Sequence, residues 1–86
     1  MPRITGLWRM DAFFDGPPPV DHNTRVLITV WVMGLITDTT PSDAVALPHR
    51  RFGTIYRAIV AGTDVEVTYR IQTTGSPRLL ELRRIR

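Results

Sequence analysis

The chain has 86 residues, of which 43% are hydrophobic and 22% charged. It is therefore long enough for one small domain (1–86) and too apolar to be globally disordered. It contains no cysteine, which excludes disulfides, thiolate metal sites and cysteine catalysis. All 11 residues of the lysine and arginine type are arginine. A domain of this size without disulfides often gains stability by pairing with another chain, so a homodimer stays open.

Positive charge is concentrated in the second part of the chain. Residues 1–49 hold three arginines against five aspartates, whereas residues 50–86 hold eight arginines against three acidic residues. Such an excess favours binding to a polyanion or to an acidic protein. The N-terminus shows no secretory signal, and the apolar run 26–36 is roughly half of the ~20 residues that cross a bilayer. We expect a soluble, cytoplasmic protein with no membrane span.

Segment 3–14 predicts a first strand, because alternation places Ile4, Trp8 and Met10 on one face. Residues 15–20, with the sequence DGPPPV, form a proline-rich connector, since proline removes backbone donors and favours an extended path. A proline-rich ligand for an aromatic groove is the alternative interpretation of this segment.

Segment 21–38 predicts a helix. Asp21 or Asn23 is a candidate cap, and the length of the segment favours a helix, whereas its many β-branched residues favour a strand. Nearly every position from Val26 onward is apolar, so periodicity does not decide between the two. Gly34 fits poorly into a buried strand, which also favours the helix.

The second half of the chain predicts an antiparallel sheet. Residues 39–51 are expected to be a loop, with at most a short helical turn after Ser42. Three strands follow, separated by the turn sequences AGTD and QTTGSP: 53–60, 65–71 and 78–85. The fold class is therefore α+β, in which a small antiparallel sheet, made of the N-terminal strand and three C-terminal strands, packs against one or two helices.

Alternation divides the predicted sheet into an apolar and a charged face. The apolar face is expected to hold Val65, Val67, Tyr69, Leu80 and Leu82. The open face is expected to hold Arg57, Thr68, Arg70 and Arg83, together with Glu66 and Glu81. These residues either form cross-strand Arg–Glu pairs or bind an external anion. An external anion is the second interpretation because three acidic residues cannot neutralise the eight arginines of residues 50–86. The arginines left over are Arg50, Arg51, Arg78, Arg84 and Arg86.

Other chemical motifs are sparse. His22 and His49 are far apart and lack neighbours with metal-ligand spacing, so neither a metal nor a cofactor is expected. His49 precedes two arginines and is either a candidate general base or an ordinary loop residue. Trp8 and Trp31 are expected to be core or dimer anchors rather than stacking platforms.

Short motifs occur in a characteristic order between residues 24 and 85. They are Leu35 and Asp38 at the helix end, Leu47 and Pro48 in the loop, Tyr56 and Arg57 in a strand, Val60 and Gly62 at a turn, Tyr69 and Ile71 at a strand end, and the Leu, Arg and Ile residues of 79–85. In this order the chain resembles the RelE/ParE superfamily of bacterial toxins from type II toxin–antitoxin systems. That resemblance implies a small antiparallel sheet with helices on one face.

The resemblance also implies an activity. RelE-like members cut messenger RNA in the ribosome without a metal, ParE-like members poison DNA gyrase, and both are neutralised by a cognate antitoxin. Arg57 matches the family motif most directly and would stabilise charge in the transition state of a metal-independent endoribonuclease; Tyr69 and His49 are the candidates for acid and base. The nucleic-acid-binding residues would be Arg50, Arg51, Arg70, Arg83, Arg84 and Arg86. The alternative is a non-catalytic interaction module, open to homodimerisation, whose arginine-rich sheet binds an acidic partner.

Overall fold

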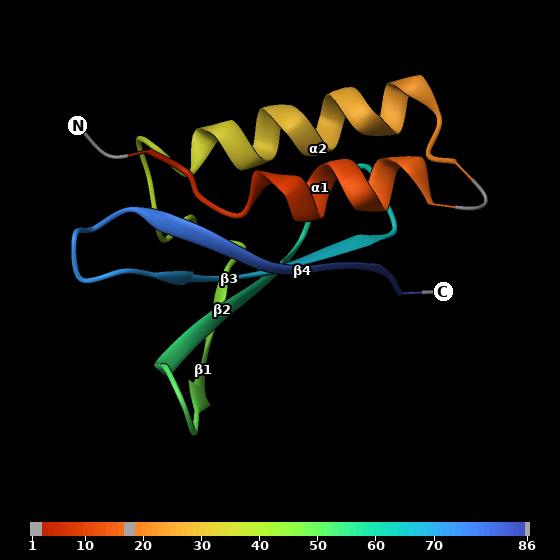
Figure 1. The fold of residues 1–86 in the computed structure, drawn as a ribbon. Helices are drawn as coiled ribbons and strands as arrows, with labels where there is room; N and C mark the ends of the chain where they lie inside the picture. The colour runs from red at the N-terminus through yellow and green to blue at the C-terminus, as the bar shows by residue number, and fades with distance from the viewer. Residues whose placement is uncertain (1–2, 17–18, 86) are drawn as a thin grey trace.

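A computed structural model of the chain describes residues 3–16 and 19–85. Two helices precede four strands, in the order α1 (Leu7–Asp15), α2 (His22–Gly34), β1 (Val45–His49), β2 (Gly53–Ile59), β3 (Val65–Ile71) and β4 (Pro77–Arg84). The strands form one sheet in chain order, and each is antiparallel to its neighbour. Both helices lie on one side of this sheet, and the β1–β2 hairpin extends away from them (Figure 1). The predicted α+β class is confirmed.

The N-terminal segment is not the predicted strand. Only Thr5 pairs with the sheet, in a parallel bridge to Arg78, and the chain then enters α1 at Leu7. The spacing of Leu7, Met10 and Phe14 fits a helix, and Met10 and Phe14 are buried in it. Trp8, predicted to share a face with Met10, is 60% exposed.

Gly6 makes the transition from the bridge to α1. Its φ of 80° lies in the left-handed region, which favours glycine. A Cβ at this position would lie only 2.6 Å from the carbonyl oxygen of Leu79. Glycine therefore allows the N-terminal segment to approach β4 closely before α1 begins.

The predicted helix over 21–38 is confirmed as α2, which ends earlier, at Gly34. The Asp21 carboxylate caps it by accepting hydrogen bonds from the amide (3.3 Å) and hydroxyl (2.6 Å) of Thr24, and these bonds lower the pKa of Asp21. Of the proline-rich connector, residues 17–18 lie outside the described residues. Ile28 and Val32 of α2 are fully buried against the sheet.

The predicted loop over 39–51 is wrong in its second half, which forms β1. The predicted helical turn after Ser42 is likewise absent, since a hydrogen-bonded turn at 42–43 leads directly into this strand. Pro48 misled the prediction because proline cannot donate to a ladder. It is tolerated in β1 because this strand pairs on one side only, with β2.

The three C-terminal strands are confirmed, but β4 contains an irregularity that the alternation did not predict. Thr68 pairs with Glu81 and Tyr69 with Leu79, so the register skips Leu80. A bulge of this kind shifts the alternation by one residue. Leu79 therefore takes the core position predicted for Leu80 and is fully buried. Leu80 is only partly buried and lines a hollow with Trp8 and Phe13 of α1.

Candidate nucleic-acid interface

The face of the sheet opposite the helices carries four of the eight predicted arginines. We call it the open face, and cross-strand pairing assigns to it Val45 and Leu47 of β1, Ile55, Arg57 and Ile59 of β2, Glu66, Thr68 and Arg70 of β3, and Arg78, Glu81 and Arg83 of β4. Residues directly opposite each other in neighbouring strands project to the same side. The prediction that Arg57, Thr68, Arg70 and Arg83 share a face is therefore confirmed.

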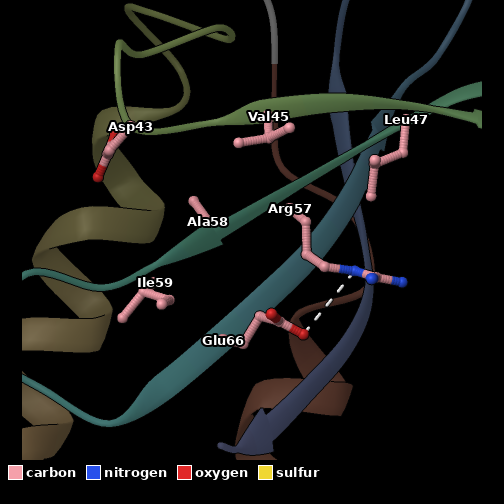
Figure 2. Close-up of a pocket in the computed structure, with 7 residues that line it drawn as sticks. All are labelled: Asp43, Val45, Leu47, Arg57, Ala58, Ile59 and Glu66. Atoms are coloured by element: carbon pink, nitrogen blue, oxygen red, sulfur yellow. Dashed lines mark ion pairs between the residues drawn. The ribbon is translucent and has the colours of Figure 1, made fainter.

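One carboxylate serves two arginines at the centre of this face. Oε1 of Glu66 lies 2.9 Å from Nε of Arg83, within hydrogen-bond distance. The same oxygen lies 3.8 Å from Nε of Arg57 (Figure 2). The Glu66 side chain is only 14% exposed, and its hydrogen bond and charge raise the pKa of Arg83. Nε of Arg57 is buried and has no hydrogen-bond partner among the described residues. Glu66 thus neutralises one of the two cations, and Glu81, which lies on the same face and also raises the pKa of Arg83, offsets part of the remaining charge.

A second pair of arginines has no acidic partner among the residues that the structure describes. Arg70 of β3 lies directly opposite Arg78 of β4, and like charges in such positions repel each other. The ion pairs found within residues 3–16 and 19–85 include neither of them. The guanidinium of Arg70 lies 4.7 Å from the centre of the Phe52 ring, and its buried Nε has no hydrogen-bond partner in the described structure. This end of the open face is therefore uncompensated.

The β1–β2 turn adds two more cations. Arg50 and Arg51 are exposed there, beside His49, whose Nδ1 accepts hydrogen bonds from the amides of Arg51 (3.0 Å) and Phe52 (3.2 Å). His49 pairs with Gly53 at one end of β1, whereas Arg57 pairs with Val45 at the other end. Four residues of strand separate the two positions by roughly 13 Å. The structure thus gives His49 a role in the turn and separates it from Arg57.

Tyr69 lies on the other face of the sheet, so its predicted role as an acid or base beside Arg57 is wrong. Its side chain is fully buried, and its hydroxyl donates a 2.6 Å hydrogen bond to the carbonyl oxygen of Thr39. Tyr56 stacks on it at 5.4 Å and Trp31 meets it edge-on at 6.2 Å. Burial above all, and then Tyr56 and two nearby aspartates, raise the pKa of Tyr69. Tyr69 is a core residue.

Of the remaining predicted residues, Arg84 does not join the open face. Arg84 pairs with Val65 and so projects to the helix side, where it lines a polar hollow with Asp21 and Asp64. The bulge does not change this assignment, because it lies upstream of Arg84. Arg86 lies outside the described residues.

A shallow hollow beside Arg57 is the feature that the sequence did not predict. It measures about 320 Å³ and is lined by Asp43, Val45, Leu47, Arg57, Ala58, Ile59 and Glu66 (Figure 2). Val45 and Ile59 are 58% and 48% exposed, so its apolar walls face solvent. The signal for it lay in β1, whose apolar residues could be assigned to a face only once this segment was known to be a strand.

The contacts of Phe52 are a second feature that the sequence did not predict. Its ring contacts His49, Arg51 and Arg70. An aromatic residue directly after His-Arg-Arg was a local signal, but its contact with Arg70, 18 positions away in the sequence, required the fold.

Comparison with known proteins returned no family model, no curated protein and no solved structure that matches this chain. Within the described residues, no group of three or more histidine or acidic side chains is arranged to hold a metal ion. In the same part of the chain, no helix combines the length and the apolar character that crossing a membrane requires.

Proposed function

We propose that this chain is a RelE/ParE-like toxin that binds RNA through the open face of its sheet. Its helices pack on one face of a small antiparallel sheet, as the resemblance implies, and four of its arginines lie on the other. Arg57, which matches the family's Tyr-Arg motif, lies at the centre of that face beside Arg83. Fold and charge therefore support the same proposal.

The observation that carries the proposal is the unpaired Arg70–Arg78 couple. Two arginines that lie directly opposite each other in neighbouring strands repel each other, and the contact of the Arg70 guanidinium with the Phe52 ring neutralises neither charge. A phosphate bound between them accepts hydrogen bonds from both and converts the repulsion into a shared attraction. A phosphodiester chain that continues across the sheet reaches Arg57, whose side chain is 41% exposed.

Arg57 would supply charge stabilisation rather than proton transfer. A guanidinium stays protonated at any working pH and donates several hydrogen bonds to a phosphate, so it suits the charge that develops when a phosphodiester is attacked. Since Tyr69 is buried on the opposite face and His49 lies at the hairpin turn, these two residues do not complete a catalytic set around it. We therefore propose RNA binding as the primary property of this face.

A second candidate is an interaction module that binds an acidic protein on the same face. The hollow beside Arg57 favours it, because Val45, Leu47 and Ile59 offer apolar contacts that a phosphate backbone does not use. A cognate antitoxin with an apolar, acidic segment would fit this description. The two candidates differ in salt dependence, which is steep for nucleic acid and weaker for a largely apolar protein interface.

The test compares Arg78→Ala with Arg84→Ala. Both remove one positive charge from β4, but Arg78 lies on the open face and Arg84 on the helix side. We expect Arg78→Ala to weaken binding of a labelled single-stranded RNA and to reduce the slope of log K against log salt by about 0.7, the value for one phosphate contact on a single strand. Arg84→Ala should leave this slope unchanged.

Expression in a heterologous bacterium supplies the functional readout. We expect the wild type to arrest growth and Arg57→Ala to relieve the arrest. Cleaved transcripts would support RNA as the target, whereas growth arrest with intact transcripts would support DNA gyrase as the target. Equal losses of RNA affinity in Arg78→Ala and Arg84→Ala, or RNA binding that does not respond to salt, would contradict the proposed interface.

A further inference from the structure

The tip of the β1–β2 hairpin carries a stack of flat side chains. The rings of His49 and Phe52 lie 4.9 Å apart with an angle of 21° between their planes. The guanidinium of Arg70 lies 4.7 Å from the centre of the Phe52 ring, and that of Arg51 lies 5.7 Å from it. These residues come from β1, from the turn and from β3, so the fold itself assembles the stack.

The stack is held in place before any ligand arrives. Two backbone amides donate to Nδ1 of His49 and so fix the orientation of its ring. Phe52 sits in the same tight turn, and Arg70 is anchored in β3. An aromatic platform that is already ordered loses little conformational entropy when a further ring stacks on it.

The core of the protein does not need this stack. Phe52 is 36% exposed and lies outside the buried cluster that joins the helices to the sheet. The hairpin that carries it projects away from both helices (Figure 1). Stabilisation of the turn accounts for the pairing of His49 with Phe52, but it does not account for the two further arginines that gather around an exposed ring.

We infer that this tip is a stacking site for an unpaired nucleobase of a single-stranded RNA. The base extends the stack of His49, Phe52 and Arg70, while Arg50 and Arg51 contact the neighbouring phosphates. Every base has a π-face, so the site is tolerant of sequence and selects single strands, whose bases are free, over duplexes, whose bases are already stacked. This inference rests on the proposed function, since it names the form of nucleic acid that the open face receives.

The experiment separates stacking from phosphate binding. Three ligands of equal length are compared by fluorescence anisotropy: a single-stranded RNA, its duplex, and an abasic phosphodiester chain. The proteins are the wild type, Phe52→Leu and Phe52→Tyr. Phe52→Tyr retains the ring and serves as the matched control, and thermal unfolding of each variant shows that the hairpin change has not unfolded the domain.

We expect the wild type to bind the single strand more tightly than the abasic chain or the duplex. Phe52→Leu should weaken single-strand binding by about tenfold, the order measured for loss of one base–aromatic stack, and leave abasic binding unchanged. Phe52→Tyr should bind like the wild type. A 2-aminopurine placed in the single strand should lose fluorescence on binding to the wild type and retain it with Phe52→Leu.

Equal single-strand affinity in the wild type and folded Phe52→Leu would overturn the stacking site and leave the phosphate interface standing. If the wild type binds none of the three ligands, the proposed function itself fails, and the inference fails with it. The two failures are therefore distinguishable in one set of measurements.

Discussion

The two faces of β3 show how one strand serves two purposes. On the helix side Val65, Val67 and Tyr69 are fully buried. On the open face Glu66 and Arg70 are half-buried and carry charge. The buried residues on the helix side exclude water and determine stability. They also stabilise the backbone that holds the charged residues of the open face at a fixed spacing. The charged side chains of the open face can therefore change with little effect on folding, whereas the buried side chains on the helix side cannot.

The largest expected effect comes from a substitution at the bulge in β4. Leu79 is fully buried and Leu80 only partly so, although the two are adjacent and chemically identical. Leu79→Ala should lower the free energy of unfolding by about 2–5 kcal/mol, and Leu80→Ala by less than about 1 kcal/mol. Urea unfolding of both variants measures the difference.

Equal effects in the two variants would place the bulge elsewhere. A larger effect of Leu80→Ala would restore the simple alternation that the sequence predicted. Either result would also change which residues of β4 share the open face with Arg57, because a shift of one residue exchanges the two faces.

A smaller effect is expected from Tyr69→Phe. The substitution removes the hydroxyl that donates to the Thr39 carbonyl at 2.6 Å, and we expect a loss of about 1 kcal/mol in the free energy of unfolding. RNA affinity and growth arrest should not change, because Tyr69 lies on the helix side of the sheet. Tyr56→Phe is the control, since its hydroxyl makes no hydrogen bond within the described residues. Loss of activity in a folded Tyr69→Phe variant would return Tyr69 to the site.

The sequence predicted the parts of the fold in which local patterns and tertiary packing agree. Alternation over 65–71 identified β3 and both of its faces, and the length and cap of 21–38 identified α2. It failed where two patterns compete. Trp8 and Met10 fit a strand by alternation, but the helical spacing of Leu7, Met10 and Phe14 buries more apolar surface against the sheet.

The candidate site was predictable only in part, for a related reason. The face shared by Arg57, Arg70 and Arg83 follows from period two alone. The bulge that skips Leu80 depends on how β4 meets β3, and no local signal marks it. The ring of Phe52 joins Arg70 only because the β1–β2 turn folds beside β3. Contacts between distant segments therefore account for most of what the sequence did not predict.

The smallest effect on stability is expected from Glu66→Gln. This substitution tests whether a change on the open face alters RNA binding without altering folding. Glu66 is the carboxylate shared by Arg57 and Arg83; its own side chain is largely buried, but both arginine side chains are about half exposed. Ion pairs that reach solvent in this way add little to stability. The melting temperature should change by no more than about 3 °C. RNA affinity at low salt should rise by about fivefold, the order expected for removing one unit charge a few ångströms from a phosphate in water. The gain should shrink as salt increases.

Asp11→Asn provides the matched control for this prediction. It removes the same charge from an exposed position in α1, on the helix side of the sheet. If affinity depends only on net charge, both variants will bind RNA more tightly by the same factor. If RNA lies on the open face, only Glu66→Gln will, because the freed guanidinium groups of Arg57 and Arg83 can then both turn to the phosphates. A gain confined to Glu66→Gln thus identifies the face itself, rather than the basic composition of the chain, as the source of binding.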